Sequence, residues 1–181
     1  MSEFEFISVS VAIVLALTLG RLMTAVNDVF AAERRDILHL GFYLLSYVAI
    51  LTMWWAQWMM VDVETWTFPA FVLVMASPIV QYFTVHALLS ANPSEIESWR
   101  SYLTRSHRWY FSALLAQNIA VAARRFLIAE DTSLLLLFLI SLNVVATLWA
   151  ILSSARIAQI VVFAVWAVAL GYAVAVQFAI A

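Results

Sequence analysis

The chain has 181 residues, of which 66% are hydrophobic and 11% are charged. That apolar share exceeds the roughly 45–50% of soluble globular domains, so it excludes an ordinary water-soluble fold and predicts an all-α bundle of membrane-spanning helices. The net charge of −2 gives no attraction for nucleic acid, and the absence of cysteine excludes disulfides, thiolate metal sites and cysteine nucleophiles.

Six apolar runs predict six transmembrane helices in a single domain, because a helix of about 20 residues crosses the hydrocarbon core of a bilayer. The runs cover residues 6–26, 37–60, 68–90, 108–128, 133–153 and 157–179. Glutamates rather than basic residues precede the first run, so we expect a membrane helix there and not a cleaved signal peptide. Asp36 is the expected N-cap of the second helix.

The connection between the third and fourth runs is the longest, and it is predicted to contain an interfacial helix near residues 94–106. Ser94 and Glu97 have the S-x-x-E spacing of a capping box, and apolar residues then recur on one face. We interpret this helix either as a gating or docking element or as a simple connector at the membrane surface.

The placement of arginine predicts how the helices are oriented. Seven of the nine basic residues fall on one side of the predicted bundle, and only Arg124 and Arg125 fall on the other, where they form an interfacial charge cluster with Glu130 and Asp131. The positive-inside rule places the side with seven arginines in the cytoplasm. Both termini then face outward, to the periplasm if the protein lies in the inner (plasma) membrane of a bacterium.

The second half of the sequence aligns weakly with the first. Ser46 and Trp54 of the second run, for example, match Ser141 and Trp149 of the fifth at one offset. A unit of three spans reverses its direction when repeated, so the match predicts two inverted three-helix halves, an arrangement typical of transporters. Chance similarity between apolar segments is the alternative.

Polar side chains within membrane spans are costly and often functional, so they are the candidates to line a pathway. Gln117 and Asn118 are adjacent near mid-depth of the fourth run, where two amides cannot both reach water. The predicted pathway-lining residues are Arg21, Ser77, Gln81, Gln117, Asn118 and Asn143, and Gln177 is a further central polar residue. The alternative is hydrogen bonding between helices, worth about 0.6 kcal/mol for each bond.

Arg21 lies inside the first run, with Asp28 as its nearest candidate partner. It is interpreted as a binding or gating group for an anion, or as an anchor whose side chain reaches the membrane surface. His39 and His86 are expected at similar depth on neighbouring helices, so they are candidate haem or metal ligands. Ordinary hydrogen-bonding histidines are the alternative, and we predict no cofactor.

Motifs of catalysis are absent from the sequence, which has no H-E-x-x-H, P-loop or G-x-S-x-G pattern and no paired carboxylates within the spans. An enzyme is therefore not expected. The missing intramembrane carboxylates also argue against a carrier coupled to protons or sodium ions.

Four short motifs carry a resemblance: LGRL at 19–22, WW at 54–55, ETWTF at 64–68 and HRWYF at 107–111. With these motifs the chain resembles an uncharacterised family of small six-helix inner-membrane proteins of bacteria. The resemblance implies a bacterial inner-membrane location and supplies no activity, ligand or catalytic residue.

The function predicted from the sequence is a transporter or channel-like protein for a neutral or weakly polar solute. One alternative is a non-catalytic accessory subunit of a larger membrane complex, and another is a haem-binding redox protein. The expected partners are the lipid bilayer and either further copies of the chain or a partner membrane subunit, with no nucleic acid.

Overall fold

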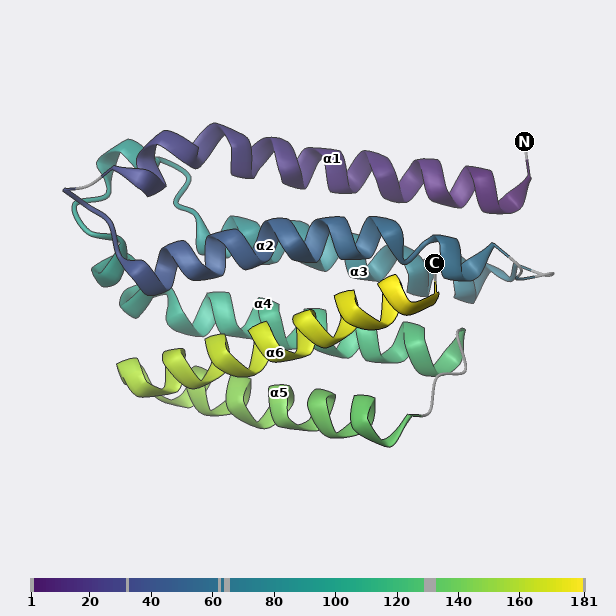
Figure 1. Ribbon diagram of the computed structural model, residues 1–181. Helices are drawn as coiled ribbons and strands as arrows, with labels where there is room; N and C mark the ends of the chain where they lie inside the picture. Colours follow the sequence, from purple (N-terminus) through teal and green to yellow (C-terminus); the bar gives the residue numbers. More distant parts are fainter. Residues whose placement is uncertain (1, 32, 62, 64–65, 129–132, 181) are drawn as a thin grey trace.

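A bundle of long helices makes up the computed structural model (Figure 1). The structure describes residues 2–31, 33–61, 63, 66–128 and 133–180, without the side chains of 59 and 177–180. Six α-helices lie in these ranges: α1 (Glu3–Phe30), α2 (Ile37–Trp55), α3 (Phe68–Leu88), α4 (Trp99–Leu127), α5 (Leu134–Leu152) and α6 (Arg156–Ile180). Glu130, Asp131 and the side chain of Gln177, which the sequence analysis singled out, lie outside the described part.

Side-chain caps explain where several helices begin. The Asp36 carboxylate accepts a hydrogen bond from the His39 backbone N–H at 2.9 Å, so the predicted N-cap of α2 is confirmed. The Ser133 hydroxyl caps α5 in the same way. Ser2 and Glu5 form a reciprocal capping box at α1, which the sequence analysis missed.

Within the described chain, five helices are long and apolar enough to cross a membrane, namely α1, α2, α3, α5 and α6. The expectation of six such apolar segments is therefore met only in part. The fourth predicted span, residues 108–128, is helical but too polar to be counted with them, because it contains Arg108, Arg124 and Arg125 as well as Gln117 and Asn118.

The helix predicted near 94–106 is not a separate element. Residues Pro93–Glu95 form only a short 3-10 turn, η2, and α4 then runs from Trp99 to Leu127 without interruption. Ser98 is its N-cap residue, so the predicted capping box of Ser94 and Glu97 does not start a helix. Residues 99–106 are instead the first two turns of α4.

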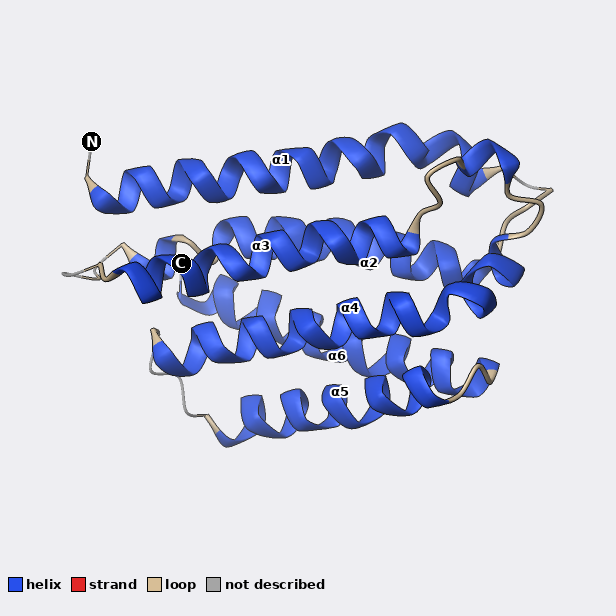
Figure 2. Ribbon diagram, turned by 180° about the vertical axis from the view of Figure 1, so that it is seen from behind, coloured by secondary structure: helices blue, strands red, loops and turns tan. Residues whose placement is uncertain are grey.

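The helices alternate in direction, so the two termini lie at the same end of the bundle (Figure 1). We call this the terminal end. The α1–α2, α3–α4 and α5–α6 connections lie at the other end, which we call the arginine end because Arg34, Arg35, Arg100 and Arg156 are located in or beside them. Helix α4 packs against both α3 and α5, while α2 packs against α1, α3 and α6 (Figure 2).

Large apolar side chains point outward along the helices. On α1 they include Phe6, Ile13 and Leu17, and on α5 they include Phe138 and Val145. Contiguous exposed apolar surface of this kind is rare on a soluble monomer and is typical of surfaces that contact lipid or a partner.

Trp99 closes the arginine end. Its side chain is fully buried, its ring stacks on His39 with 4.4 Å between centroids, and its indole Nε1–H donates to the Asp28 carbonyl at 3.0 Å. Its backbone N–H donates to the carbonyl of Arg34 at 3.1 Å. The start of α4 is thereby fixed to both α1 and the α1–α2 turn.

Three arginines tie the connections at this end together. Arg34 donates to the carbonyls of Pro93, Ser94 and Ile96 at 3.0–3.3 Å and lies 3.6 Å from the Asp28 carboxylate. The other two bridge helices: Arg156 pairs with Asp36, joining α6 to α2, and Arg21 donates to the Ser90 carbonyl, joining α1 to the end of α3. The arginine end is closed by groups that are bonded to one another.

Candidate functional site: a polar cavity near the terminal end

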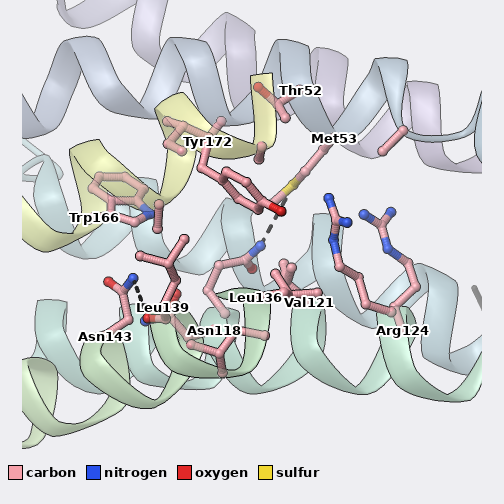
Figure 3. A pocket seen from close by; sticks show the side chains of 18 of the residues that line it. Thr52, Met53, Asn118, Val121, Arg124, Leu136, Leu139, Asn143, Trp166 and Tyr172 are labelled. Carbon is pink, nitrogen blue, oxygen red and sulfur yellow. Dashed lines mark hydrogen bonds between the residues drawn. The ribbon is translucent and has the colours of Figure 1, made fainter. Parts of the chain in front are cut away.

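A cavity of about 120 Å³ lies inside the bundle between α2, α3, α4, α5 and α6. Its lining comes from the last turns of α2 and α4, the first half of α5 and the second half of α6, which places it toward the terminal end. In Figure 3, Asn143 and Trp166 lie at one end of the pocket and Arg124 lies at the other.

Four of the six residues predicted to line a pathway lie around this cavity. They are Gln81 of α3, Gln117 and Asn118 of α4, and Asn143 of α5. The structure thus brings together side chains from three helices that the sequence singled out only as costly intramembrane polar groups.

The amides of these residues are largely unpaired. Both polar atoms of the Gln81 amide, Oε1 of Gln117, Nδ2 of Asn118 and Oδ1 of Asn143 are buried and have no hydrogen-bond partner among the described residues. The remaining contacts are weak or local, because Gln117 Nε2 reaches only the Met53 sulfur at 3.7 Å and Asn143 Nδ2 donates to its own helix at Leu139, at 3.2 Å. Buried polar atoms are normally hydrogen-bonded, so this set of unpaired atoms calls for an explanation.

Arg124 and Arg125 also line the cavity, although the sequence analysis assigned them to an interfacial cluster. Both side chains are buried, and Nη1 of Arg124 has no hydrogen-bond partner within the described structure. The signal that would have found them is periodicity: each follows an amide, Gln117 or Asn118, by seven residues, a spacing that returns to the same helix face.

The rest of the wall is mainly apolar. Met53, Leu136, Leu139, Trp166 and Ala173 contribute to it, and no carboxylate from the described ranges lines the cavity. The described lining combines amide and guanidinium groups with apolar walls, an arrangement that suits the binding of a solute.

Arg21 and Ser77, the other two predicted pathway residues, do not line the cavity. Arg21 is half-buried near the arginine end, where it bonds the Ser90 carbonyl, and its expected partner Asp28 pairs with Arg34 instead. Ser77 is fully buried in α3, beside Pro78, and its hydroxyl has no partner among the described atoms. Arg21 therefore links α1 to the segment after α3, and neither residue is part of the cavity lining.

The two candidate haem ligands have different surroundings. His39 is buried against Trp99, and its Nε2 lies 3.0 Å from the Leu88 carbonyl, whereas His86 is exposed and its ring lies against Tyr82. A haem held between them would require His39 to leave both of its contacts. Across the described residues there is also no cluster of three or more His, Cys, Asp or Glu side chains that would hold a metal ion.

No protein-family model, curated protein or solved structure matches this chain. The arguments for its function therefore rest on the cavity and on the bundle around it.

Proposed function

We propose that the chain is a multi-span membrane protein of a bacterial inner membrane that binds a small solute inside its bundle and transports it or lets it pass. The outward apolar side chains of α1 and α5 and the five apolar helices support the membrane location. Helix α4 is the sixth span in this proposal. Its polar residues Gln117, Arg124 and Arg125 are buried inside the bundle, so they do not face lipid.

One observation carries the proposed solute binding: the unpaired amide atoms of Gln81, Gln117, Asn118 and Asn143 surround a cavity. Amides that only joined helices would be hydrogen-bonded to other helices, as the alternative interpretation of these residues requires. Amides that bind water or a solute have no protein partner for their hydrogen-bonding atoms when the water or solute is not bound. The apolar walls suit a solute that is neutral or weakly polar over most of its surface.

Cysteine accessibility tests this proposal directly, because the native chain contains no cysteine. Ala173 lines the cavity, whereas Ala175, two residues further along α6, is exposed on the outside of the bundle. We expect Ala173→Cys in membranes to react with a water-soluble, membrane-impermeant thiosulfonate, since the cavity holds water. Ala175→Cys is expected not to react, because its thiol faces lipid.

A second matched pair lies on α4, where Asn118 lines the cavity and the neighbouring Ile119 faces outward. Asn118→Cys is expected to react and Ile119→Cys to remain unmodified. Reagent added to the outside of spheroplasts should suffice, since the proposed topology directs the terminal end outward. If neither cavity cysteine reacts from either side of the membrane, the cavity is dry and the proposed function is wrong.

The accessory-subunit alternative has one observation in its favour. Trp54, Trp55 and Trp58 at the end of α2 are exposed together, and clustered aromatic residues occur at subunit interfaces as well as at lipid headgroups. Native mass spectrometry of protein gently extracted from its own membranes distinguishes the two cases. A stoichiometric partner polypeptide would favour the accessory subunit, while the bare chain or a homo-oligomer would favour a self-contained transporter.

A further inference from the structure

We infer that the solute of this cavity is an amphipathic organic anion, whose carboxylate or phosphate group binds Arg124 and whose apolar body lies along the wall toward Asn143. This inference rests on the proposed function, because it names the chemical class of the solute. It differs from the sequence-based expectation of a neutral solute in one respect, the single anionic group.

The Arg124 guanidinium supplies the first argument. The residue is only 6% exposed, Nη1 is buried without a hydrogen-bond partner in the described structure, and no carboxylate from the described ranges shares the cavity with it. A buried guanidinium nitrogen that lacks a hydrogen-bond partner is costly. An anionic ligand would supply the missing partner, and a guanidinium binds carboxylate or phosphate oxygens through two parallel hydrogen bonds.

The arrangement of the lining supplies the second argument. Arg124 and Gln117 are seven residues apart on one face of α4, which corresponds to roughly 10 Å along the helix axis. Apolar side chains, including Met53 and Leu136, line the cavity between its two ends, and Trp166 lies with Asn143 at the end away from Arg124. A solute that satisfies the whole cavity therefore has one charged end, an apolar middle and a neutral polar group or bound water at the far end.

The electrostatic potential inside the cavity can be measured without any ligand. Ala173→Cys is labelled with two thiosulfonates of similar size and opposite charge. One carries an anionic sulfonate and the other a cationic trimethylammonium group. We expect the ratio of the anionic to the cationic labelling rate to be about tenfold higher at Ala173→Cys than at Thr67→Cys, an exposed position at the same end. Adding Arg124→Gln should bring the ratio close to that of the control, whereas Arg124→Lys should preserve it.

Ligand chemistry is tested with octanoate, 1-octanol and octylammonium, which share an apolar body and differ in the charge of one end. The probe is the rate at which iodoacetamide, a neutral reagent, alkylates Ala173→Cys in the full-length protein in phosphatidylcholine vesicles. Octanoate is expected to slow this reaction about tenfold or more at concentrations where the other two compounds have no effect. Thr67→Cys, alkylated under the same conditions, corrects for changes at the membrane surface.

Variants on one helix identify the group that holds the anion. Arg124→Gln should abolish protection by octanoate. Arg124→Lys keeps the positive charge and should retain part of the protection, and it provides the test if the glutamine variant does not fold. Arg108→Gln, at the opposite part of α4 and exposed, is the matched control and should leave protection unchanged. Protection that survives Arg124→Gln would overturn the inference.

The remaining outcomes separate this inference from the proposed function. If Ala173→Cys reacts but 1-octanol protects it as well as octanoate, the cavity binds a solute and the anion inference is wrong. Absence of protection by all three compounds overturns it too, while absence of labelling overturns the proposed function itself.

Protection that appears without octanoate in vesicles containing phosphatidylglycerol identifies a lipid headgroup as the anion, whereas protection by octanoate alone identifies a soluble one.

Discussion

The two ends of the bundle use the same residue types in opposite ways. At the arginine end, Arg34 bonds three backbone carbonyls and Asp28, and Arg156 pairs with Asp36. Near the terminal end, Arg124 is more deeply buried than either, yet part of its guanidinium has no partner among the described residues. Burial of an arginine is therefore not in itself a sign of function.

Arg21 Nε and His39 Nδ1 at the arginine end are also buried without a partner among the described residues, but neither residue borders the cavity. What distinguishes the terminal end is that its unpaired groups surround a cavity. A closed network stabilises the fold and leaves nothing for a ligand to bind, whereas unpaired groups around a cavity cost stability that a ligand would restore. The comparison predicts that substitutions at the arginine end mainly reduce stability. Substitutions at the cavity are expected to change binding with little loss of stability.

The largest effect is expected from truncating the two buried tryptophans. Trp99 is packed on all sides, whereas one side of Trp166 borders the cavity. Trp99→Ala should lower the free energy of unfolding by about 3–5 kcal/mol. Trp166→Ala should lower it by less, because fewer contacts are lost. Chemical denaturation in detergent, followed by circular dichroism, measures both, and equal losses would contradict the difference in packing between the two regions.

The ion pair between Asp36 and Arg156 should give the next largest effect. The Asp36 side chain is only 10% exposed, and it both caps α2 and binds Arg156. Asp36→Asn retains the ability to cap and loses the charge, so the expected loss of about 1.5–3 kcal/mol reports on the pair. A double-mutant cycle with Arg156→Gln measures the coupling energy, and a coupling near zero would show that the pair does not stabilise this end.

Two arginine substitutions compare the ends directly. Arg34→Gln should lower the free energy of unfolding by about 1–1.5 kcal/mol, since several hydrogen bonds to carbonyls are lost at a partly exposed site. Arg124→Gln should cost less or even stabilise the protein, because it removes a buried charge that lacks a full set of partners. Denaturation of both variants without added solute tests this, and a larger loss for Arg124→Gln would indicate that Arg124 is structural.

Much of the fold could be predicted from the sequence, because long apolar runs separated by charged residues leave few alternatives to spanning helices. The N-cap at Asp36 was also visible in the sequence. The start of α4 was not, since Trp99 and its neighbours look like an amphipathic surface helix until the stacking on His39 and the bond to Asp28 are known. Those contacts depend on helix packing and leave no local pattern.

The site was predictable to a similar degree. Gln81, Gln117, Asn118 and Asn143 line the cavity, because an amide in an apolar helix tends to face the interior of the bundle, and their role in a pathway stays a prediction. Arg21 lies away from the cavity and donates to the Ser90 carbonyl, and a backbone acceptor far along the chain cannot be identified from side-chain types. The inverted repeat stays a prediction: α1 packs along α3, while the corresponding contact of α4 with α6 is not among the main helix contacts of the described chain.

The smallest expected effect concerns the three glycines, which report how tightly each region is packed. A Cβ atom on Gly41 of α2 would lie 2.6 Å from the Phe163 ring of α6, whereas a Cβ on Gly20 or Gly171 would meet no atom within 4 Å. Alanine is favoured over glycine in a helix by about 0.5–1 kcal/mol, so Gly20→Ala and Gly171→Ala should raise the melting temperature slightly. Gly41→Ala should lower it, because the overlap with Phe163 exceeds that gain. A rise for Gly41→Ala would mean that the Phe163 ring moves aside, and that the contact between α2 and α6 near the arginine end is looser than the structure indicates.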